Sequence, residues 1–379
     1  MTVDAWRDRR LPLWPLALVV PALPFAGLAL SGGPAGPWGW WLAPVVVFGL
    51  IPLVDLAFGD DRQNPPEEAV PALQRSPYYR WITYLYLPAQ YAALAVTCRE
   101  WAAGVGPAAG AGLVLTAGIV NGIAINTAHE LGHKRERVER WLSRIALAPT
   151  GYGHFFVEHN RGHHVRVATP EDPASARLGE SFWRFWPRTV AGGLRSAWRL
   201  ETARLRLRGR SPWTWRNDVL TAWAMTVLLF AALTAVHGWT VLPFLALQAV
   251  AGFSLLEAVN YLEHYGLLRQ PTGTGRAEKV DPRHSWNSDR LVTNVFLFQL
   301  QRHSDHHANP LRRYQTLRTF DVSPRLPAGY ATMVVVALVP PLWRRIMDPR
   351  VLAHYGGDAS LANRDRNFHT PPAARTATG

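Results

Sequence analysis

The chain has 379 residues, of which 48% are hydrophobic and only 18% charged, yet its formal net charge is +13. Its single cysteine, Cys98, excludes an internal disulfide, a zinc ribbon held by cysteines and any iron–sulfur centre bound by four cysteines of this chain. Any electrons that its chemistry requires must therefore come from another protein. The basic residues form no stripe with interleaved base-stacking aromatics, so the charge favours anionic headgroups over nucleic acid as its partner.

Apolar and charged residues lie in separate segments, as is typical of a protein embedded in a lipid bilayer. A membrane-spanning helix needs about 20 apolar residues to cross roughly 30 Å of hydrocarbon. Six segments approach this length and predict an all-α membrane protein with six transmembrane helices. The predicted spans cover about residues 11–30, 37–58, 78–98, 104–126, 218–237 and 239–261. The third reaches the required length only when its flanking aromatic residues are counted.

Three arginines in the first ten residues precede the first apolar segment, an arrangement that resembles a signal peptide. The apolar segment is too long, however, and lacks an obvious small-residue cleavage site, so we expect a retained anchor.

The distribution of lysine and arginine predicts the orientation. The loops at 31–36, 97–105 and 237–238 contain one basic residue, Arg99, and all other basic residues lie on the opposite side. By the positive-inside rule, the opposite side is cytoplasmic. We therefore expect a multi-pass protein of the cytoplasmic (inner) membrane with both termini in the cytoplasm.

Two long insertions, residues 127–216 and 262–350, would then form a helical cap on the cytoplasmic side of a single domain, residues 1–350. The apolar segment 330–343 is short and contains Pro340 and Pro341, so it predicts a core or interfacial helix rather than a seventh span. The polar residues 351–379 predict a disordered tail.

Nine of the 14 histidines fall in four clusters, with spacings of three and four residues that place imidazoles on one face of a helix. Imidazole is a ligand for Zn, Cu, Fe and Ni, and spacing does not choose among them. Nine ligands exceed the four to six or so that one ion accepts, so the count predicts two metals. The predicted ligands are His129, His133, His159, His163, His164, His264, His303, His306 and His307.

The clusters lie where four remote segments can converge. His129 follows the fourth predicted span and His264 the sixth, each within about one helical turn of the membrane boundary. The other two clusters lie in the two insertions. A single site beneath the helical bundle is the simplest arrangement.

Two other classes of function would also use clustered histidines. The segment His129–His133 alone matches H-E-x-x-H, the signature of zinc proteases, with Glu130 as general base. An intramembrane protease would use two of these histidines, one further ligand and a water, and would leave most of the others unexplained. A metal transporter or sensor would place its ligands along a pore rather than outside the bilayer. The isolated residues His237, His284, His354 and His369 need no special role.

Several groups beside the clusters are candidates for orienting the ligands by hydrogen bonds. Neighbours on a helix point about 100° apart, so a carboxylate next to a histidine would serve a different ligand or pair with a nearby arginine. A carboxylate bridging the two metals stays open for Glu130 or Glu158. The candidates are Glu130, Glu158, Glu263, Asp305 and His154.

Glu257 lies seven residues before His264, on the same helical face and deeper in the last span. An ionisable group at that depth is a functional candidate. Snorkelling or a contact with Asn260 would explain it equally well.

Taken together, these segments resemble the motifs of the membrane-bound non-haem di-iron alkane hydroxylases, the AlkB-type alkane 1-monooxygenases. The resemblance runs from about residue 64 to 349, and the four motifs lie at 129–134, 158–164, 260–267 and 300–307. Fatty acid desaturases share a looser pattern of three histidine boxes, and xylene monooxygenases are closer. Neither group carries the box at 260–267 in this form.

The resemblance implies two iron ions held by the nine histidines, O₂ as co-substrate, and terminal hydroxylation of medium-to-long-chain n-alkanes to 1-alkanols. It also implies electrons from rubredoxin and rubredoxin reductase, and the basic cytoplasmic surface suits an acidic donor. The alternatives are a fatty acyl desaturase-like and a xylene-monooxygenase-like di-iron enzyme.

An alkane offers no charge or hydrogen bond for recognition and partitions into the bilayer. A narrow apolar channel between spans would present the chain end first to the metals. On the second and sixth spans, the lining candidates are Trp40, Trp41, Val47 and Phe253.

Overall fold

The computed structural model describes residues 6–273, 275–366 and 368. Throughout this part of the chain the regular elements are helices, and extended pairing is limited to four isolated bridges. The long helices are α5 (Pro77–Ala102), α6 (Pro107–Gly132), α10 (Phe182–Arg206), α11 (Asp218–His237) and α12 (Val241–His264). The all-helical prediction is confirmed.

The N-terminal region forms a helical hairpin made of short pieces. Its first arm is the 3₁₀ turn η2 (Trp14–Leu18) and α1 (Val19–Ser31). The second arm runs unbroken over Gly36–Phe58 through η3 (Gly36–Trp41), α2 (Leu42–Val45), the π-helix η4 (Val46–Leu50) and α3 (Ile51–Phe58).

The remaining helices are short and connect or cover the bundle. They are η5 (Glu67–Ala69), α4 (Val70–Arg75), α7 (Arg137–Leu147), η6 (Ala148–Thr150), α8 (Phe155–Glu158), the π-helix η7 (His159–His163), α9 (His164–Arg166), η8 (Pro282–His284), α13 (Leu291–Phe296), α14 (His303–Ala308), η9 (Tyr314–Thr316), α15 (Tyr330–Ala337), α16 (Pro340–His354) and η10 (Ala359–Leu361).

Five helices of the described residues are long and apolar enough to cross a membrane: Trp14–Ser31, Gly36–Phe58, Pro107–Gly132, Asp218–His237 and Val241–His264. Each matches one predicted span. The sixth predicted span, 78–98, falls within α5, which is long enough at 26 residues but less apolar than the other five. Six spans were expected, and length and composition support five.

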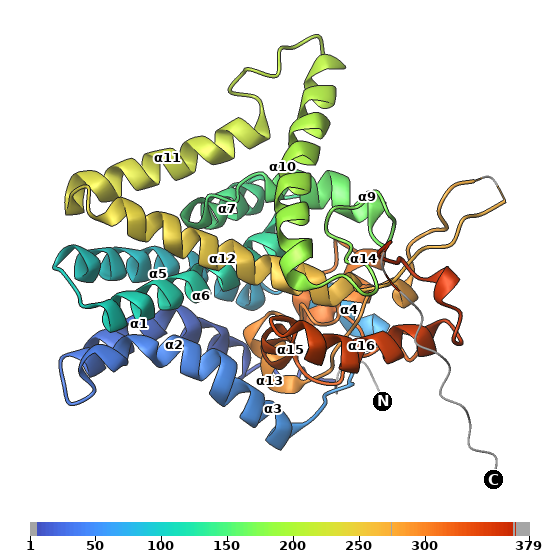
Figure 1. The fold of residues 1–379 in the computed structure, drawn as a ribbon, viewed down its shortest axis with the longest axis horizontal. Coiled ribbons are helices and arrows are strands. Elements are labelled where there is room, and N and C mark those ends of the chain that lie inside the picture. Colours follow the sequence, from blue (N-terminus) through green and yellow to red (C-terminus); the bar gives the residue numbers. More distant parts are fainter. Residues whose placement is uncertain (1–5, 274, 367, 369–379) are drawn as a thin grey trace.

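Figure 1 shows how these helices place the functional part of the chain. The bundle helices α5, α6, α11 and α12 and the N-terminal hairpin are joined by tight loops at one end, while α14, α15 and α16 gather at the opposite end. We call α8, α9 and α13–α16 the cap. The ends of α6 and α12 that carry His129 and His264 point into the cap.

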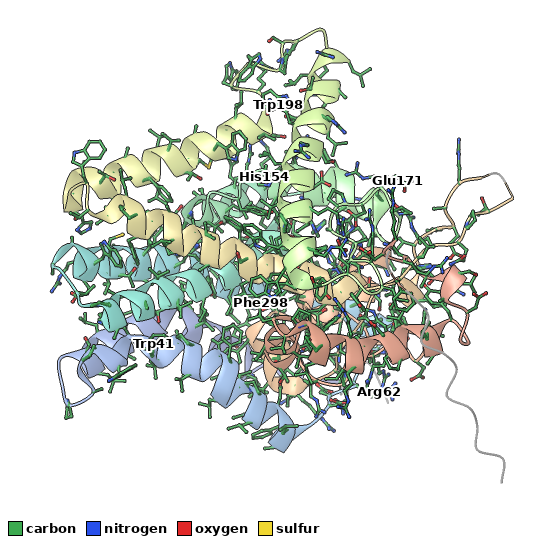
Figure 2. All side chains as sticks on the ribbon, viewed as in Figure 1. Trp41, Arg62, His154, Glu171, Trp198 and Phe298 are labelled. Atoms are coloured by element: carbon green, nitrogen blue, oxygen red, sulfur yellow. The ribbon has the colours of Figure 1, made fainter. Side chains whose placement is uncertain are left out.

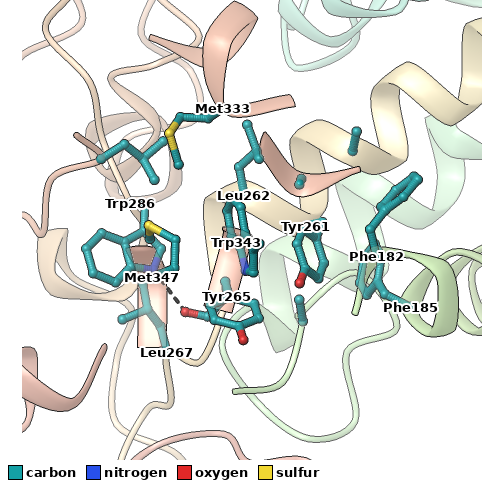
Figure 3. Close-up of a cluster of buried hydrophobic side chains, with 14 of the residues drawn as sticks. Phe182, Phe185, Tyr261, Leu262, Tyr265, Leu267, Trp286, Met333, Trp343 and Met347 are labelled. Carbon is teal, nitrogen blue, oxygen red and sulfur yellow. Dashed lines mark hydrogen bonds between the residues drawn. The ribbon is translucent and has the colours of Figure 1, made fainter. Parts of the chain in front are cut away.

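An aromatic cluster attaches α12 to the cap and to α10. The rings of Tyr261 and Tyr265 lie 4.9 and 5.2 Å from the ring of Trp343 on α16, and Phe185 of α10 lies 5.4 Å from Tyr261 (Figure 3). These side chains are fully buried, so their burial contributes a large part of the energy that holds the cap in place.

The C-terminal segments differ from the predicted tail. Pro340 and Pro341 end α15 and begin α16, as expected for residues that cannot continue a helix, and α15 packs in the core. Residues 351–366 are ordered: α16 continues to His354, and Asn363 exchanges backbone hydrogen bonds with Gly266 and Leu178. The rest of the predicted tail, including His369, lies outside the described residues except for residue 368.

Helices α6 and α12 approach each other through small residues. A Cβ atom added to Gly118 would lie 2.5 Å from the Cβ atom of Ala251, and one added to Gly122 would lie 2.7 Å from the carbonyl oxygen of Gly252. Glycines four residues apart share one helical face, and small residues there let two backbones come close. This contact fixes where the C-terminal ends of both helices, and so His129 and His264, are placed.

Three buried amide side chains link the same helices to α5. Asn121 accepts a hydrogen bond from Gln90 at 3.0 Å and donates to Gln248 at 2.8 Å, and Gln248 donates to the carbonyl of Pro149 at 2.7 Å. In an apolar environment such interhelical hydrogen bonds satisfy groups that would otherwise be costly to bury.

The close contact predicts that Gly122→Ala is destabilising, because its new methyl group meets backbone that cannot move aside. We expect a loss of about 1–3 kcal/mol, typical of overpacking in a core. Gly49→Ala is the matched control, since a Cβ atom there has no neighbour within 4 Å. Thermal unfolding of both variants in the same detergent checks this, and equal transition temperatures would contradict it.

Candidate metal centre

Four segments bring nine histidines together at the cap end of the bundle. His129 and His133 lie at the end of α6, His264 ends α12, and the remaining six lie on η7, α9 and α14. Their ring nitrogens form two groups, and within each group the candidate ligand atoms all lie within 4.8 Å of one another. The first group is His129, His133, His159, His164 and His306, and the second is His163, His264, His303 and His307. These are the nine residues that the sequence pattern singled out.

Adjacent histidines belong to different groups. His163 and His164 are divided between them, and so are His306 and His307. Neighbouring residues on a helix point about 100° apart, so they cannot aim at one ion. Each adjacent pair therefore joins the two groups through a single peptide bond.

A π-helix decides how the 159–164 cluster is divided. In an α-helix His159 would share a face with His163, four residues on. Here residues 159–163 form η7, whose hydrogen bonds span five residues, and His159 is instead grouped with His164. Their Nε2 atoms lie 3.1 Å apart. Short π-helical segments often occur at functional sites.

The nitrogens are arranged as ligands of a common ion are. The Nε2 atoms of His306 and His164 lie 3.1 Å apart, and those of His307 and His303 lie 2.9 Å apart. Nitrogens bound about 2.1 Å from one ion are separated by roughly 3 Å, which matches these distances. The buried Nε2 atoms of four further members have no protein partner: His129, His133, His163 and His264. These donor atoms fit metal ions.

Burial keeps most of these imidazoles uncharged. Burial, and then the neighbouring histidines, lower the pKa of His159, His303 and His306 well below the usual value. The pKa values of His133, His164 and His307 are lowered in the same way. Neutral imidazole is the form that binds metals, so at neutral pH the groups are ready to accept an ion without releasing protons.

Two members of the second group are oriented by hydrogen bonds at Nδ1, the ring nitrogen that does not face the other histidines. Nδ1 of His163 lies 2.9 Å from a carboxylate oxygen of Asp172, and Nδ1 of His264 lies 3.3 Å from the carbonyl oxygen of His284. Burial works to raise the pKa of Asp172, but His163 and the Ser175 hydroxyl outweigh it and lower that pKa. The sequence analysis missed Asp172, because Thr169–Pro173 resembles a simple turn.

Glu130 and Asp305, two of the five predicted orienting groups, each pair with a cation that lies a few residues further along the chain. Glu130 forms an ion pair with Lys134 at 3.1 Å, and Asp305 accepts hydrogen bonds from Arg312 at 2.8 and 2.9 Å. Each serves to brace its own segment, which is the arginine- or lysine-paired alternative considered for these carboxylates.

The other three differ from one another in what they contact. Glu263 is in contact with the second group, its carboxylate 3.1 Å from Nε2 of His303. Glu158 pairs with Arg166 at 2.7 Å, and burial raises its pKa to about 7. His154 contacts the ring of Tyr152, and within the described residues it forms no hydrogen bond with a member of either group; burial lowers its pKa to about 4. Of these three groups, Glu263 is the one that contacts a nitrogen of a clustered imidazole.

A buried arginine fixes the cluster on α14. Arg302 donates hydrogen bonds to the carbonyl oxygens of Asp61 and Leu317, both at 2.8 Å, and of Gln63 at 3.1 Å. It thereby ties the residue before His303 to the loop that precedes α4. No sequence pattern separated this arginine from its many neighbours.

An apolar cavity of about 800 Å³ ends at the histidines. It is lined by Val20, Val47 and Ile51 of the N-terminal hairpin and also by His129, His159 and His303. The few polar lining groups, Asn126, Asn260, Glu263, Thr293 and Tyr330, include residues next to the ligands in sequence. A chain without polar groups could enter it from the bundle and meet the imidazoles with one end.

Of the four predicted lining residues, Val47 lines this cavity and three lie elsewhere. Trp40 packs against Gly112 in a separate core cluster, and Trp41 donates a hydrogen bond to the carbonyl of Ala108, near the loop end of the bundle (Figure 2). Phe253 stacks on Tyr152 and Trp186. The prediction failed for these three because apolar side chains on a span more often pack against neighbouring helices than face a cavity.

Comparison with known proteins also indicates an enzyme related to the alkane hydroxylases. A family model described as fatty acid desaturase matches residues 106–337, more than half of the chain. An alkane 1-monooxygenase from Ectopseudomonas oleovorans is 48% identical over 357 residues, covering 93% of this chain and 88% of that protein. One from Acinetobacter baylyi is 44% identical, covering 94% and 88%. The hydroxylase component of a xylene/toluene monooxygenase from Pseudomonas putida is 25% identical over 62% of each chain.

The desaturase-type match first defines a broad class of helical enzymes with histidine-bound metals. The long alignments then define the family: the chain belongs to the alkane 1-monooxygenases, and it is a monooxygenase. The resemblance seen in the sequence motifs is confirmed. The match to the xylene/toluene enzyme is weaker and shorter, so neither that alternative nor a desaturase is favoured.

Asp172 provides a test of the second histidine group. Asp172→Asn removes the carboxylate that orients His163, and loss of such a partner typically costs 10–100-fold in metal affinity. Glu171→Gln, at the exposed neighbouring position, is the matched control. Metal content after dialysis against graded chelator checks this. If both variants keep their metal equally well, Asp172 does not position a ligand.

Proposed function

We propose that this chain is a di-iron alkane 1-monooxygenase of the inner membrane. The observation that carries the proposal is the apolar cavity that ends at two groups of buried histidines. The overall reaction would be RH + O₂ + 2e⁻ + 2H⁺ → ROH + H₂O, with RH an n-alkane of medium or greater length. The relatives named alkane 1-monooxygenase support this choice of substrate and product.

The nine histidines would hold two irons, five residues around one and four around the other. When bound, the irons supply the chemistry of O₂ reduction and C–H oxidation. Nitrogen donors suit several transition metals, and the choice of iron rests on the family. Two carboxylates contact the second group. Glu263 lies against Nε2 of His303 and would offer an oxygen donor to the ion, while Asp172 contacts Nδ1 of His163 and would orient that ligand.

The protein's own contribution is to position the substrate and exclude water. Dispersion contacts and apolar burial would bind the alkane along the cavity, and the cavity would admit a chain end first because it is narrow. Val20, Val47 and Ile51 would hold the far part of the chain, while the histidine end receives the terminal carbon. An apolar wall also protects the reacting centre from side reactions with water.

We place six spans in the membrane, α5 included, with the cap in the cytoplasm. The loops at the end opposite the cap contain a single basic residue, Arg99, whereas the cap and its connections are rich in arginine. Both termini would then be cytoplasmic. Substrate would enter the cavity from the bilayer, in which alkanes dissolve.

Rubredoxin, reduced by its reductase, would deliver the electrons. A surface depression of about 890 Å³ is lined by Arg75, Arg80, Arg135 and Arg313, with Glu136 beside them, and by Lys134, whose ammonium group is buried against Glu130. Complementary charge steers an acidic donor to such a surface. Docking there would bring the donor next to the first histidine group.

The proposal predicts about two irons per chain, from the ligand count. With rubredoxin, reductase and NADH, octane or a longer n-alkane should give the 1-alcohol, carrying an oxygen atom from isotopically heavy O₂. His303→Ala should lose iron and activity together, because it removes a ligand of the second group. His354→Ala, outside both groups, is the control.

Mass spectrometry of the products separates the alternatives. A desaturase would yield a product that has lost two hydrogens and gained no oxygen. Absence of a terminal alcohol from any linear alkane in an assay with competent electron transfer would exclude the proposed function.

Val47 tests the binding mode of the substrate. Val47→Phe narrows the cavity away from the histidines, so we expect the longest accepted alkanes to lose turnover while shorter ones are retained. Val45→Phe, at an exposed position outside the cavity lining, is the matched control. Product profiles over a series of chain lengths check this, and an unchanged profile would remove Val47 from the substrate path.

A further inference from the structure

A second cavity, with more polar side chains in its lining, lies next to the apolar cavity described above, which we call the alkane cavity. It encloses about 340 Å³, has room for water, and is lined by Tyr152, His154, Phe155, Glu158, His159, His163, Pro173, Ala174, Thr189, Gly193, Glu257 and Asn260. It includes one ligand from each group, His159 and His163. It shares only Phe155, His159 and Asn260 with the alkane cavity. We call it the polar chamber.

Glu257 is the most unusual group of the polar chamber. Its carboxyl accepts hydrogen bonds from Tyr152 at 2.6 Å, Thr189 at 2.9 Å and Asn260 at 3.1 Å, and it is 3% exposed. Among the described residues no arginine, lysine or histidine forms an ion pair with it. Burial without a cationic partner favours the protonated carboxyl, and the Tyr152 and Thr189 hydroxyls can turn to accept its proton instead of donating. It also makes no direct contact with a clustered histidine.

An ion pair links Glu158, in the wall of the chamber, to the protein surface. Glu158 and Arg166 are joined at 2.7 Å, and the Arg166 side chain is 30% exposed. The buried Oε2 atom of Glu158 and both ring nitrogens of His154 have no protein partner, so the chamber offers polar atoms to water along its length. The alkane cavity, with its apolar walls, offers few such atoms.

We propose that the polar chamber is the proton path of the proposed monooxygenase and that Glu257 is its proton-holding residue. The inference rests on the proposed function, in which each turnover consumes two protons together with two electrons from rubredoxin. In each turnover the O–H bond of Glu257 would break as its proton passes to chamber water and on toward the histidine groups, where the irons would supply the chemistry of O₂ reduction. The carboxylate is then reprotonated from cytoplasmic water past Glu158 and Arg166. Protons and alkane thus reach the metals by separate routes.

The first test needs no turnover. Infrared spectra of the purified protein in H₂O and D₂O should show a carbonyl band of a protonated carboxylic acid that shifts with deuterium and is absent from Glu257→Gln. Gly193→Leu should keep the band but slow its exchange, because the side chain fills the chamber. Gly193→Ala is the matched control, since a Cβ atom there has its nearest neighbour, Cγ of Glu158, at 3.9 Å. A band that persists in Glu257→Gln, or exchange unaffected by Gly193→Leu, would overturn the proposal.

The second test measures coupling. Glu257→Gln should keep its iron, form alcohol about 100-fold more slowly, as expected when a positioned acid is lost, and release more hydrogen peroxide per electron. Asp55→Asn, which alters another buried carboxyl hydrogen-bonded by a threonine, should keep wild-type coupling. Wild-type rate and coupling in Glu257→Gln, or loss of its iron, would overturn the role of Glu257.

The two proposals fail separately. If the wild-type protein holds no iron or forms no alcohol, the proposed function fails, and the infrared exchange still decides whether Glu257 is a protonated, water-accessible acid. If the wild-type protein is active and the Glu257 and Gly193 variants behave as the wild type does, the proposed proton path is wrong and the proposed function stands.

Discussion

The structure depends on nine buried imidazoles whose ring nitrogens face one another. Hydrogen bonds among these imidazoles cannot supply a partner for every nitrogen. Four Nε2 atoms have no protein partner, and three other Nε2 pairs lie within about 3 Å of each other. A buried nitrogen without a partner costs free energy, because it has lost its hydrogen bonds to water. A bound metal ion removes this cost, because it becomes the partner of the nitrogen. The backbone contact between α6 and α12, the buried Arg302 and the aromatic cluster around Trp343 serve to hold the four histidine segments at this one place.

Two cavities with linings of different polarity adjoin the histidine groups. Apolar side chains of the N-terminal hairpin and of α12 and α15 line the larger cavity, whereas Tyr152, Thr189 and Glu257 line the polar chamber. Both cavities touch His159. A reaction that joins a hydrocarbon, an oxygen atom and protons needs these reactants to meet only at the metal, and two unlike cavities on one ligand provide that separation.

The membership of the site could be predicted from the sequence, and its internal order could not. Clustered histidines are visible as residue types, but their division depends on the π-helix at residues 159–163, which helical periodicity does not reveal. Asp172 looked like part of a turn, and Arg302 like any other arginine, because hydrogen bonds across long separations leave no local signal. Likewise, Trp40, Trp41 and Phe253 were indistinguishable from lining residues, since packing and cavity-facing positions have the same composition. For α5, tyrosine and other polar side chains lower its hydropathy, so its length and composition do not by themselves identify it as a membrane span.

The pairs His163–His164 and His306–His307 connect the two groups rigidly, because each crosses between them in one residue. A shift of either ion would pull on the backbone that carries a ligand of the other. Occupancy of one position would therefore affect the other, because an ion that orders its own ligands would also place a ligand of the second ion. A chain that had lost one metal ion would then hold the other in a less ordered set of ligands.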